Sequence, residues 1–434
     1  MAPPLQGSYR RLRQFLAYSD KVFGLTSLLD GIHDSRERGK IPTSIGARAL
    51  FFTGLLRIRS FNALDPRLGE LDVAMLLSGR RLSNKKRLCS IDTIARIADG
   101  MDVTETRDVV VAMIRIGERN KAFRDGWLGG MRAVAIDGWE PFSSEHRHCE
   151  SCLTRTVRRK ETDVVQYYHR YVVALLLGKK MDVVIDVEEI RNADQRVEAG
   201  ELDVAGHEGE LTAGKRLISS LRETYGRWID IIVADALYAN GPFFSLVDKC
   251  GYGSIVILKK ATDQPYRYAA LCWDDDKPNQ VASPPGGPEL QIWRTIGIRE
   301  LRTFRGEIDV VRAVFHDRRG RHEWVFAATG KARKLAPESI IETGRGRWHI
   351  ENTAFHDWVT GWNFDHVFRH SPNAILALLY LFVAAFNALQ FFTYLHVRSY
   401  GRNRGGDTTR TIVRLVDEMA GDLARWCLPG FDSS

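Results

Sequence analysis

The sequence contains few cysteines and lacks the common enzyme fingerprints. Six cysteines in 434 residues are too sparse for a disulfide scaffold, which agrees with a reducing compartment. The opening stretch MAPPLQGSYRRLRQF has no apolar region followed by a small-residue cleavage site, so we expect no secretory signal and a cytoplasmic protein. No P-loop, dinucleotide fingerprint, nucleophile elbow or internal repeat is present. These absences direct attention to other chemistry.

Only one hydrophobic run is long enough to cross a bilayer, at residues 374–395. Asn387 and Gln390 interrupt this run, and no second segment of the kind occurs. Polar side chains at such depth are costly in lipid. We therefore predict a helix of the protein core and no membrane partner.

The composition is that of a soluble globular protein with two or three domains, since 44% of residues are apolar and 27% are charged. Lys and Arg outnumber Asp and Glu by 62 to 54, which gives a formal net charge of +8. A basic excess points to polyanionic partners, of which nucleic acid is the commonest.

Residues 1–130 show apolar positions at helical spacing and predict a mainly helical N-terminal DNA-binding domain. A basic cluster that includes Lys85, Lys86 and Arg87 precedes a helix that should begin near Ser90, a good N-cap residue. The cluster could contact DNA or form an ordinary solvated loop.

Residues 131–263 alternate between strands and helices. The predicted order is strand (133–137), strand (166–178), strand (181–190), helix (208–226), strand (228–235), helix (241–251) and strand (254–260). This order predicts a mixed α/β sheet. Its first and fourth strands end at Asp137 and Asp235, and open α/β sheets place their sites at the carboxyl ends of strands.

The remaining chain is predicted to contain three further parts. Residues 264–330 alternate like antiparallel strands and form a β insertion domain; residues 331–396 return to the core; residues 397–434 form a polar tail. In a helix over 344–358, Trp348, Glu351, Asn352, Phe355 and Val359 would share one face. A carboxylate in an apolar stripe needs a partner, either Arg347 four residues earlier or a cation.

Asp137, Asp235 and Glu351 together offer hard oxygen ligands, which suit Mg²⁺ or Mn²⁺. Two such ions can bind both the attacking and the leaving oxygen of a phosphodiester. The set therefore predicts metal-assisted phosphoryl transfer.

The motifs around these residues resemble those of a known family. AIDGWE at Asp137, VADALYAN at Asp235 and RWHIENTAFHDW at Glu351, followed by WNFDHVFRH and SPNAILALL, resemble the DDE transposases of bacterial insertion sequences, in the branch with a β insertion before the glutamate. The resemblance covers residues 131–395. It implies a ribonuclease-H-like fold in which Asp137, Asp235 and Glu351 are the catalytic, metal-binding residues.

The resemblance also implies a reaction and partners. The protein would cleave and join double-stranded DNA at element ends and target, as a homodimer acting on the bacterial nucleoid. Arg347 matches a family position that contacts DNA phosphate. Two other phosphate-contacting positions, a Tyr and a Lys in many members, are occupied here by Gly344 and Trp358. The hairpin route of cleavage in that branch is therefore in doubt.

A possible zinc knuckle follows Asp137 in the sequence. Cys149 and Cys152 have zinc-ligand spacing, with His146 and His148 beside them, although no second Cys-x-x-Cys completes a ribbon. Unmetallated loop residues are the alternative. His366 and His370 are interpreted as structural histidines.

Further basic residues are candidates for contact with the DNA backbone, or else belong to solvated turns. They are Arg155, Arg158, Arg159 and Lys160 after the knuckle, and Lys259 and Lys260 at the end of the last core strand.

Three alternatives to a transposase remain open from the sequence. The first is a ribonuclease-H-like nuclease that cuts without joining. The second is a catalytically inactive DNA-binding derivative, and the third is an RNA-processing nuclease on the same fold.

Overall fold

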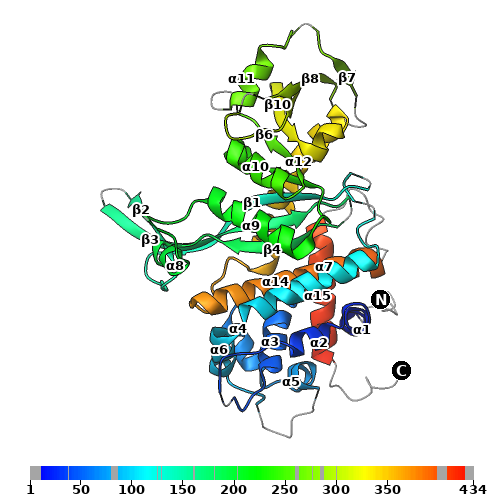
Figure 1. Cartoon of the computed structure of the whole chain (residues 1–434). Helices are drawn as coiled ribbons and strands as arrows, with labels where there is room; N and C mark the ends of the chain where they lie inside the picture. The colour runs from blue at the N-terminus through cyan, green and yellow to red at the C-terminus, as the bar shows by residue number, and fades with distance from the viewer. Residues whose placement is uncertain are drawn as a thin grey trace. The chain divides into compact units, whose positions relative to one another are not determined.

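The computed structural model of the chain describes residues 11–37, 39–79, 87–124, 126–128, 130–159, 162–179, 181–202, 204–259, 263–275, 277–283, 288–299, 301–397 and 408–425. The chain divides into two compact units (Figure 1). Unit 1 comprises Met1–Ala122, Glu140–His169 and Phe355–Ser434, and unit 2 comprises Phe123–Trp139 and Arg170–Ala354.

Unit 1 is built mainly from helices. They are α1 (Arg11–Phe23), α2 (Leu25–Asp30), α3 (Thr43–Leu55), α4 (Phe61–Arg67), α5 (Leu71–Ser78), α6 (Ile91–Gly100), α7 (Val103–Arg119), α13 (His356–Trp362), α14 (Pro372–Phe391) and α15 (Thr408–Arg425). As predicted, Ser90 caps α6, where its hydroxyl accepts a hydrogen bond from the Thr93 amide. The predicted helical character of this region is confirmed for its described residues, which form α1 to α7 between Arg11 and Arg119.

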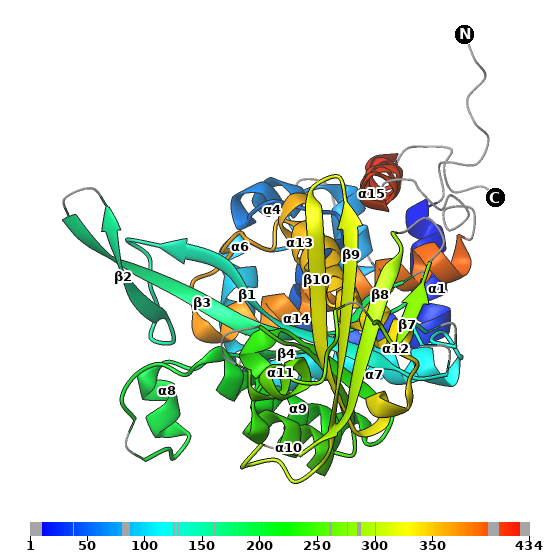
Figure 2. The ribbon, with the colours of Figure 1, turned by 90° about the horizontal axis from the view of Figure 1, so that it is seen from above.

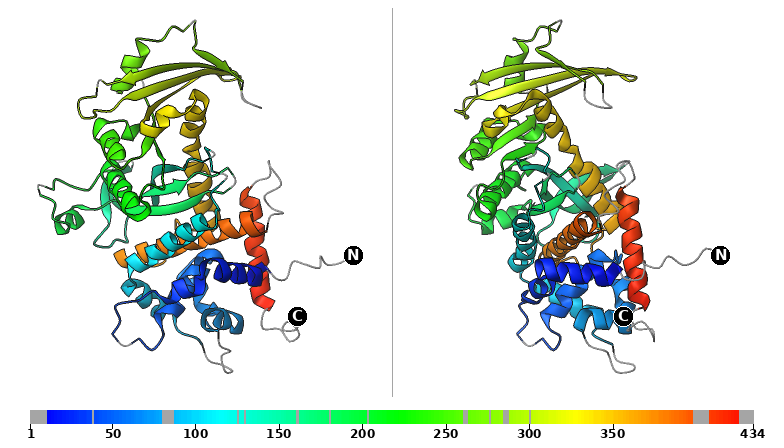
Figure 3. Two further views of the ribbon diagram at one scale, coloured as in Figure 1. Left: turned by 45° about the vertical axis from the view of Figure 1, so that its right-hand side comes forward. Right: turned by 90° about the vertical axis from the view of Figure 1, so that its right-hand side faces the viewer.

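Helix α14 is the core of unit 1 and packs against α3, α6 and α7 (Figure 3). With the π-helical turn η4 (Phe392–His396) it forms the one stretch, within the described part of the chain, that is long and apolar enough to cross a membrane. The apolar window of this stretch is 94% buried inside the protein. Asn387 and Gln390 are buried there too. The stretch is a core helix, as the sequence predicts.

A strand hairpin belongs to the same unit. Strands β2 (Leu153–Arg159) and β3 (Thr162–Leu176) pair antiparallel, with Leu153 opposite Tyr168. Strand β3 begins in unit 1 and ends in unit 2. Strand β1 (Ala133–Ser144) begins in unit 2 and ends in unit 1. Strand β2 was not predicted, because its exposed arginines hide the alternation of a half-buried strand.

The sheet of unit 2 has the order β4-β3-β1-β5-β6, with β4 (Val183–Glu189), β5 (Ile231–Ala234) and β6 (Gly253–Ile257). Strand β3 is antiparallel to β4, whereas β1, β5 and β6 are mutually parallel. Helix α8 (Ala193–Glu198) follows β4, α9 (Glu210–Tyr225) packs on β4, and α10 (Gly241–Lys249) packs on β6. This is the ribonuclease-H-like topology, with the predicted order of elements.

The predicted β insertion extends this sheet. After α11 (Gln264–Ala270), strands β7 (Gln280–Ala282), β8 (Leu290–Ile298), β9 (Ile308–Asp317) and β10 (Gly320–Thr329) lie side by side (Figure 2). Strand β10 pairs antiparallel with β6, with Ala327 opposite Val256. The chain then enters the 3-10 turn η2 (Gly330–Lys334), α12 (Pro337–Gly346) and the π-helical turn η3 (Ile350–Phe355).

Candidate functional site

Asp137 and Asp235 lie at the same level of two adjacent parallel strands. The predicted end of the first strand at Asp137 is wrong, because β1 continues to Ser144 and Asp137 lies within it. Ala133 of β1 is paired with Ile231 of β5, and the same 98-residue offset separates Asp137 from Asp235. Strand β5 ends at Ala234, so Asp235 is the first residue beyond it, where its carboxylate accepts a hydrogen bond of 2.9 Å from the Leu237 amide. The backbone pairing thus brings the two acidic positions together, as the sequence predicts.

Glu351 is linked to the first aspartate through Arg347. One guanidinium nitrogen, Nη1, donates to Oδ2 of Asp137 at 2.5 Å and lies 2.6 Å from Oε1 of Glu351. The Arg347 side chain is only 7% exposed, whereas that of Glu351 is 47% exposed. The predicted bridge between Arg347 and Glu351 is therefore real, and it includes the strand residue as well.

Asp137 has an unusual electrostatic environment. Burial raises its pKa to about 7, Arg347 opposes that rise, and the negative charges of Glu351 and Glu210 add to it. The Gly138 amide donates to its Oδ1 at 2.9 Å. Because burial makes ionisation of this carboxyl group unfavourable, a nearby cation stabilises its charged form strongly.

A fourth carboxylate, Glu210, completes the acidic cluster. It stands in the first turn of α9, accepts from Arg170 at 2.5 Å and from the Tyr238 hydroxyl at 3.3 Å. A Cβ at Gly138 would overlap its Oε2, so the carboxylate lies directly against the backbone beside Asp137. Burial also raises the pKa of Glu210, against the effect of Arg170. Sequence reasoning missed Glu210, whose one visible signal is an acidic residue at a helix start.

The predicted buried stripe on the Glu351 helix is wrong. Trp348 is 50% exposed and Val359 is 42% exposed, while Ile350, Ala354 and Trp358 are fully buried. The stretch contains the π-helical turn η3, and its buried residues Arg347, Ile350, Ala354 and Trp358 recur at ordinary helical steps of three and four, so a different apolar stripe faces the core. Glu351 consequently lies on an accessible face, which leaves its carboxylate open to a substrate or an ion.

The acidic donor set fits hard divalent cations by its chemistry. Asp137, Asp235 and Glu351 provide carboxylate oxygens of the kind that Mg²⁺ and Mn²⁺ prefer. Among the described residues, one set of Asp, Glu, His or Cys side chains lies close enough together to share one ion. That set lies elsewhere and includes the two cysteines before β2. In this form the cation between Asp137 and Glu351 is the guanidinium of Arg347. An ion that binds Asp137 therefore competes with Arg347.

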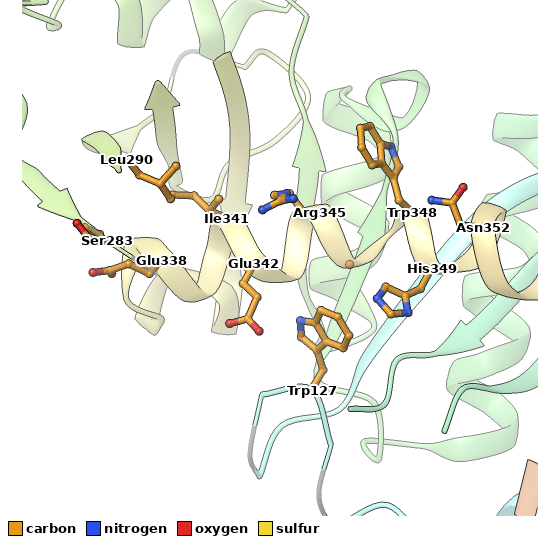
Figure 4. A pocket seen from close by; sticks show the side chains of 12 residues that line it. Trp127, Ser283, Leu290, Glu338, Ile341, Glu342, Arg345, Trp348, His349 and Asn352 are labelled. Atoms are coloured by element: carbon orange, nitrogen blue, oxygen red, sulfur yellow. The ribbon is translucent and has the colours of Figure 1, made fainter. Parts of the chain in front are cut away.

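A cavity of about 780 Å³ in unit 2 follows the exposed side of α12 and the residues after it (Figure 4). The Trp127 ring contacts that of His349, with centroids 4.8 Å apart. Arg345, Trp348 and Asn352 also line this cavity, immediately before and after Arg347 and Glu351 in the chain. The cavity presents a guanidinium, an indole and an amide, groups that can contact phosphates and bases.

Both departures from the family pattern occupy packed positions. A side chain at Gly344 would overlap the Phe326 ring of β10. Trp358 is fully buried, and its ring centroid lies 5.1 Å from that of Phe364. Neither position has room to present a phosphate-binding side chain to solvent.

The basic residues of the β2–β3 hairpin are partly neutralised within unit 1. Arg155 pairs with Glu140 at 2.7 Å and lies over the Tyr168 ring, and Arg159 pairs with Glu145 at 2.6 Å. Arg158 is exposed, and no ion pair involves it within the described ranges. Their contact with DNA remains a prediction.

The other basic candidates are more scattered. Arg87 pairs with Asp65 and donates a hydrogen bond to the Cys89 carbonyl, so it stabilises the segment that leads into α6. Lys259 is exposed at the end of β6. The predictions for Lys85, Lys86, Lys160 and Lys260 fall outside the described residues.

The predicted knuckle residues separate into two groups. Cys149 and Cys152 come together, with Sγ atoms 3.7 Å apart. His146 and His148 are exposed and do not join them; the His148 ring stacks on Tyr167 instead. The histidines that do join the cysteines are His169 of β3 and His370, which precedes α14. The prediction was wrong in its histidines, because local spacing does not reveal partners far along the chain.

Taken together, the strand order and the acidic cluster define a ribonuclease-H-like protein with a carboxylate centre on its adjacent parallel strands β1 and β5. Residues 178–388 match the family described as transposase DDE domain. The matched residues include Asp235 and Glu351, whereas Asp137 lies before them.

Among solved structures, the synaptic complex of piggyBac transposase with hairpin DNA, determined by cryo-EM, is similar to this chain with a TM-score of 0.44 and 12% sequence identity. The similarity covers 99% of this chain and 84% of that chain. No curated protein matches the sequence significantly.

Proposed function

We propose that this protein is a DNA transposase that cleaves and joins phosphodiesters at the ends of a bacterial insertion sequence, acting on nucleoid DNA in the cytoplasm. Asp137, Asp235 and Glu351 would hold Mg²⁺ or Mn²⁺. The observation that carries the proposal is the pairing of β1 with β5, whose offset equals the separation of the two aspartates. The transposase DDE domain match over 178–388 supports it.

The residues of the site have distinct tasks in this proposal. Bound divalent ions would lower the pKa of an attacking water or 3′-hydroxyl and stabilise the departing 3′-oxygen. Asp137, within β1, and Asp235, just after β5, would provide ligands at matched levels of two paired strands. Glu351 approaches from an accessible helix face, where a phosphodiester can reach it. Arg347 holds the two carboxylates together until an ion replaces it.

Double-stranded DNA is the proposed partner, bound along the cavity beside the Glu351 helix. Arg345, Trp348 and Asn352 line this cavity and supply a positive charge, a stacking surface and an amide. The formal charge of +8 favours a polyanion. Two element ends have to be joined to one target, so a homodimer is the proposed assembly.

The test compares the full-length wild type with Glu351→Gln on DNA duplexes that carry the inverted repeats flanking the gene, in Mg²⁺. The wild type should nick at the element boundary, whereas Glu351→Gln should bind the same duplex and cut at least about 100-fold more slowly. Glu223→Gln is the matched control, since Glu223 is an exposed carboxylate of α9 that does not line the cavity.

The alternatives correspond to other outcomes of the same experiment. A duplex with a precut 3′-hydroxyl end distinguishes a transposase from a nuclease, because only the former joins that end to a plasmid. If neither wild type nor variant cuts but both bind, the protein is an inactive DNA-binding derivative. Equal cutting by both would reduce Glu351 to a structural partner of Arg347.

A further inference from the structure

Four metal-binding side chains from distant parts of unit 1 meet at one point outside the acidic cluster. Cys149 and Cys152 lie in the loop before β2, His169 lies in β3, and His370 directly precedes Ser371, the N-cap of α14. Their ligand atoms all lie within 4.8 Å of one another. Cys152 and His370 are 218 positions apart in the chain. Such convergence is a product of the tertiary fold and not of local sequence.

Four of the six separations among these ligand atoms match a tetrahedral zinc centre. Bond lengths of about 2.3 Å to sulfur and about 2.0–2.1 Å to nitrogen place tetrahedral ligands about 3.8 Å apart for two sulfurs and about 3.5 Å apart for a sulfur and a nitrogen. The two Sγ atoms are 3.7 Å apart. The His169 Nε2 lies 3.3 Å from Cys149 and 3.4 Å from Cys152. The His370 Nε2 lies 3.3 Å from the sulfur of Cys152.

The surroundings are those of a closed site. Cys152 is 5% exposed and His169 is 1% exposed. The Phe142 ring stands beside both imidazoles, with centroids 5.7 Å from His169 and 6.0 Å from His370. The Cys149 amide donates to the Cys152 sulfur at 3.3 Å, an outer contact that favours a thiolate. Four protein ligands leave no open position for substrate, which is the mark of a structural centre.

We propose that Cys149, Cys152, His169 and His370 bind one Zn²⁺ as a structural Cys₂His₂ centre. The ion would fasten the base of the β2–β3 hairpin to the start of α14 within unit 1. The hairpin carries Arg155 and Arg158, so its orientation determines where those side chains are presented. This assignment does not depend on the proposed transposase activity.

A redox-active pair of cysteines is the competing interpretation of the same residues. A disulfide requires the two sulfurs to lie about 2.05 Å apart. The observed 3.7 Å is instead the spacing of two ligands of one ion. A disulfide would also leave two imidazole nitrogens facing sulfurs that no longer carry protons or charge. The two histidines therefore favour metal.

The test measures zinc in the full-length protein, purified under reducing conditions, by mass spectrometry of the elements. We expect about one zinc per chain in the wild type. His370→Ala and Cys152→Ser should lower that content to near zero. His148→Ala and Cys272→Ser are the matched controls, since both residues are exposed and outside the cluster.

Co²⁺ exchange into the wild type keeps the proposal testable if the cluster variants fail to fold. Tetrahedral Co²⁺ with two thiolates should give an intense visible absorption together with a sulfur-to-metal charge-transfer band. A wild type that contains no zinc and gives no such spectrum overturns the proposal. So does a Cys149–Cys152 disulfide in the intact mass, or a metal content that depends on His148 and not on His370.

Discussion

Asp137 and Asp235 stand at the same level on neighbouring parallel strands, because the 98 residues between them equal the offset at which β1 pairs with β5. Neither carboxylate depends on a flexible loop for its place. The third acid, Glu351, reaches this pair through the guanidinium of Arg347. Five predictions follow from these contacts and from the packing around them.

Arg347→Ala should destabilise the metal-free protein and make it depend on divalent ions. The change leaves the Asp137 carboxylate, which is 14% exposed, without its cation. We expect a loss of about 3–5 kcal/mol in the free energy of unfolding in EDTA. Added Mn²⁺ should restore more stability to this variant than to the wild type, because the ion no longer competes with the guanidinium. Arg345→Ala, at an exposed neighbouring position, is the control in urea denaturation.

Gly138→Ala should displace Glu210. The new Cβ would overlap the Glu210 carboxylate, which Arg170 and Tyr238 hold in place. We expect about 1–3 kcal/mol of destabilisation by overpacking. Combining it with Glu210→Ala should recover part of the loss, and a double-mutant cycle measures that coupling. Strictly additive changes in the free energy of unfolding would show that the two residues do not interact sterically.

Trp358→Lys, which restores the family residue, should damage the fold without strengthening DNA binding. The indole is fully buried between the Phe364 and Phe386 rings. We expect at least about 3–5 kcal/mol of lost stability, the range for removal of a large core side chain. Thermal unfolding and a DNA-binding titration check the two parts separately. A stable variant with tighter DNA binding would contradict this prediction.

Binding of Mn²⁺ should weaken as the pH falls below about 7. Burial raises the pKa of Asp137 from an ordinary value of 3.8 to about 7, with Arg347 opposing the rise. A metal ligand has to be deprotonated, so the apparent affinity should fall by up to about tenfold for each pH unit below that value. Titrations of Mn²⁺ followed by electron paramagnetic resonance at several pH values test this.

The same pKa has a consequence for stability. The pKa of Asp137 is higher in the folded protein than in the unfolded chain. In the metal-free protein, its contribution to the free energy of unfolding is therefore fully present below pH 3.8 and is lost as the pH rises through about 7. Asp137→Asn should remove that part of the pH dependence. If wild type and variant vary identically with pH, the carboxyl does not titrate in this range.

The sequence was sufficient for the order of the core strands β1, β3, β4, β5 and β6 and for the end of β5 at Asp235, because buried strands and a following Asp are local patterns. It ended the first strand too early, because the half-buried residues after Asp137 do not read as a continuous apolar run. It placed the wrong face of the Glu351 helix in the core, since apolar residues stand on two faces of this helix and the face with Ile350, Ala354 and Trp358 is the buried one. Glu210 and His169 escaped detection for a different reason. Each reaches its partners only through tertiary contacts, and nothing beside them in the sequence marks those partners.

Because the insertion returns to the core sheet, the fold should tolerate changes in the length of the insertion. Strand β10 comes back to pair with β6, and the chain passes from it directly into α12. The turn between Asp317 and Gly320, which joins β9 to β10, can therefore change in length without moving the start of α12 and the Glu351 helix. A fluorescent or affinity domain grafted at this turn would report on the protein in cells while the acidic cluster stays intact.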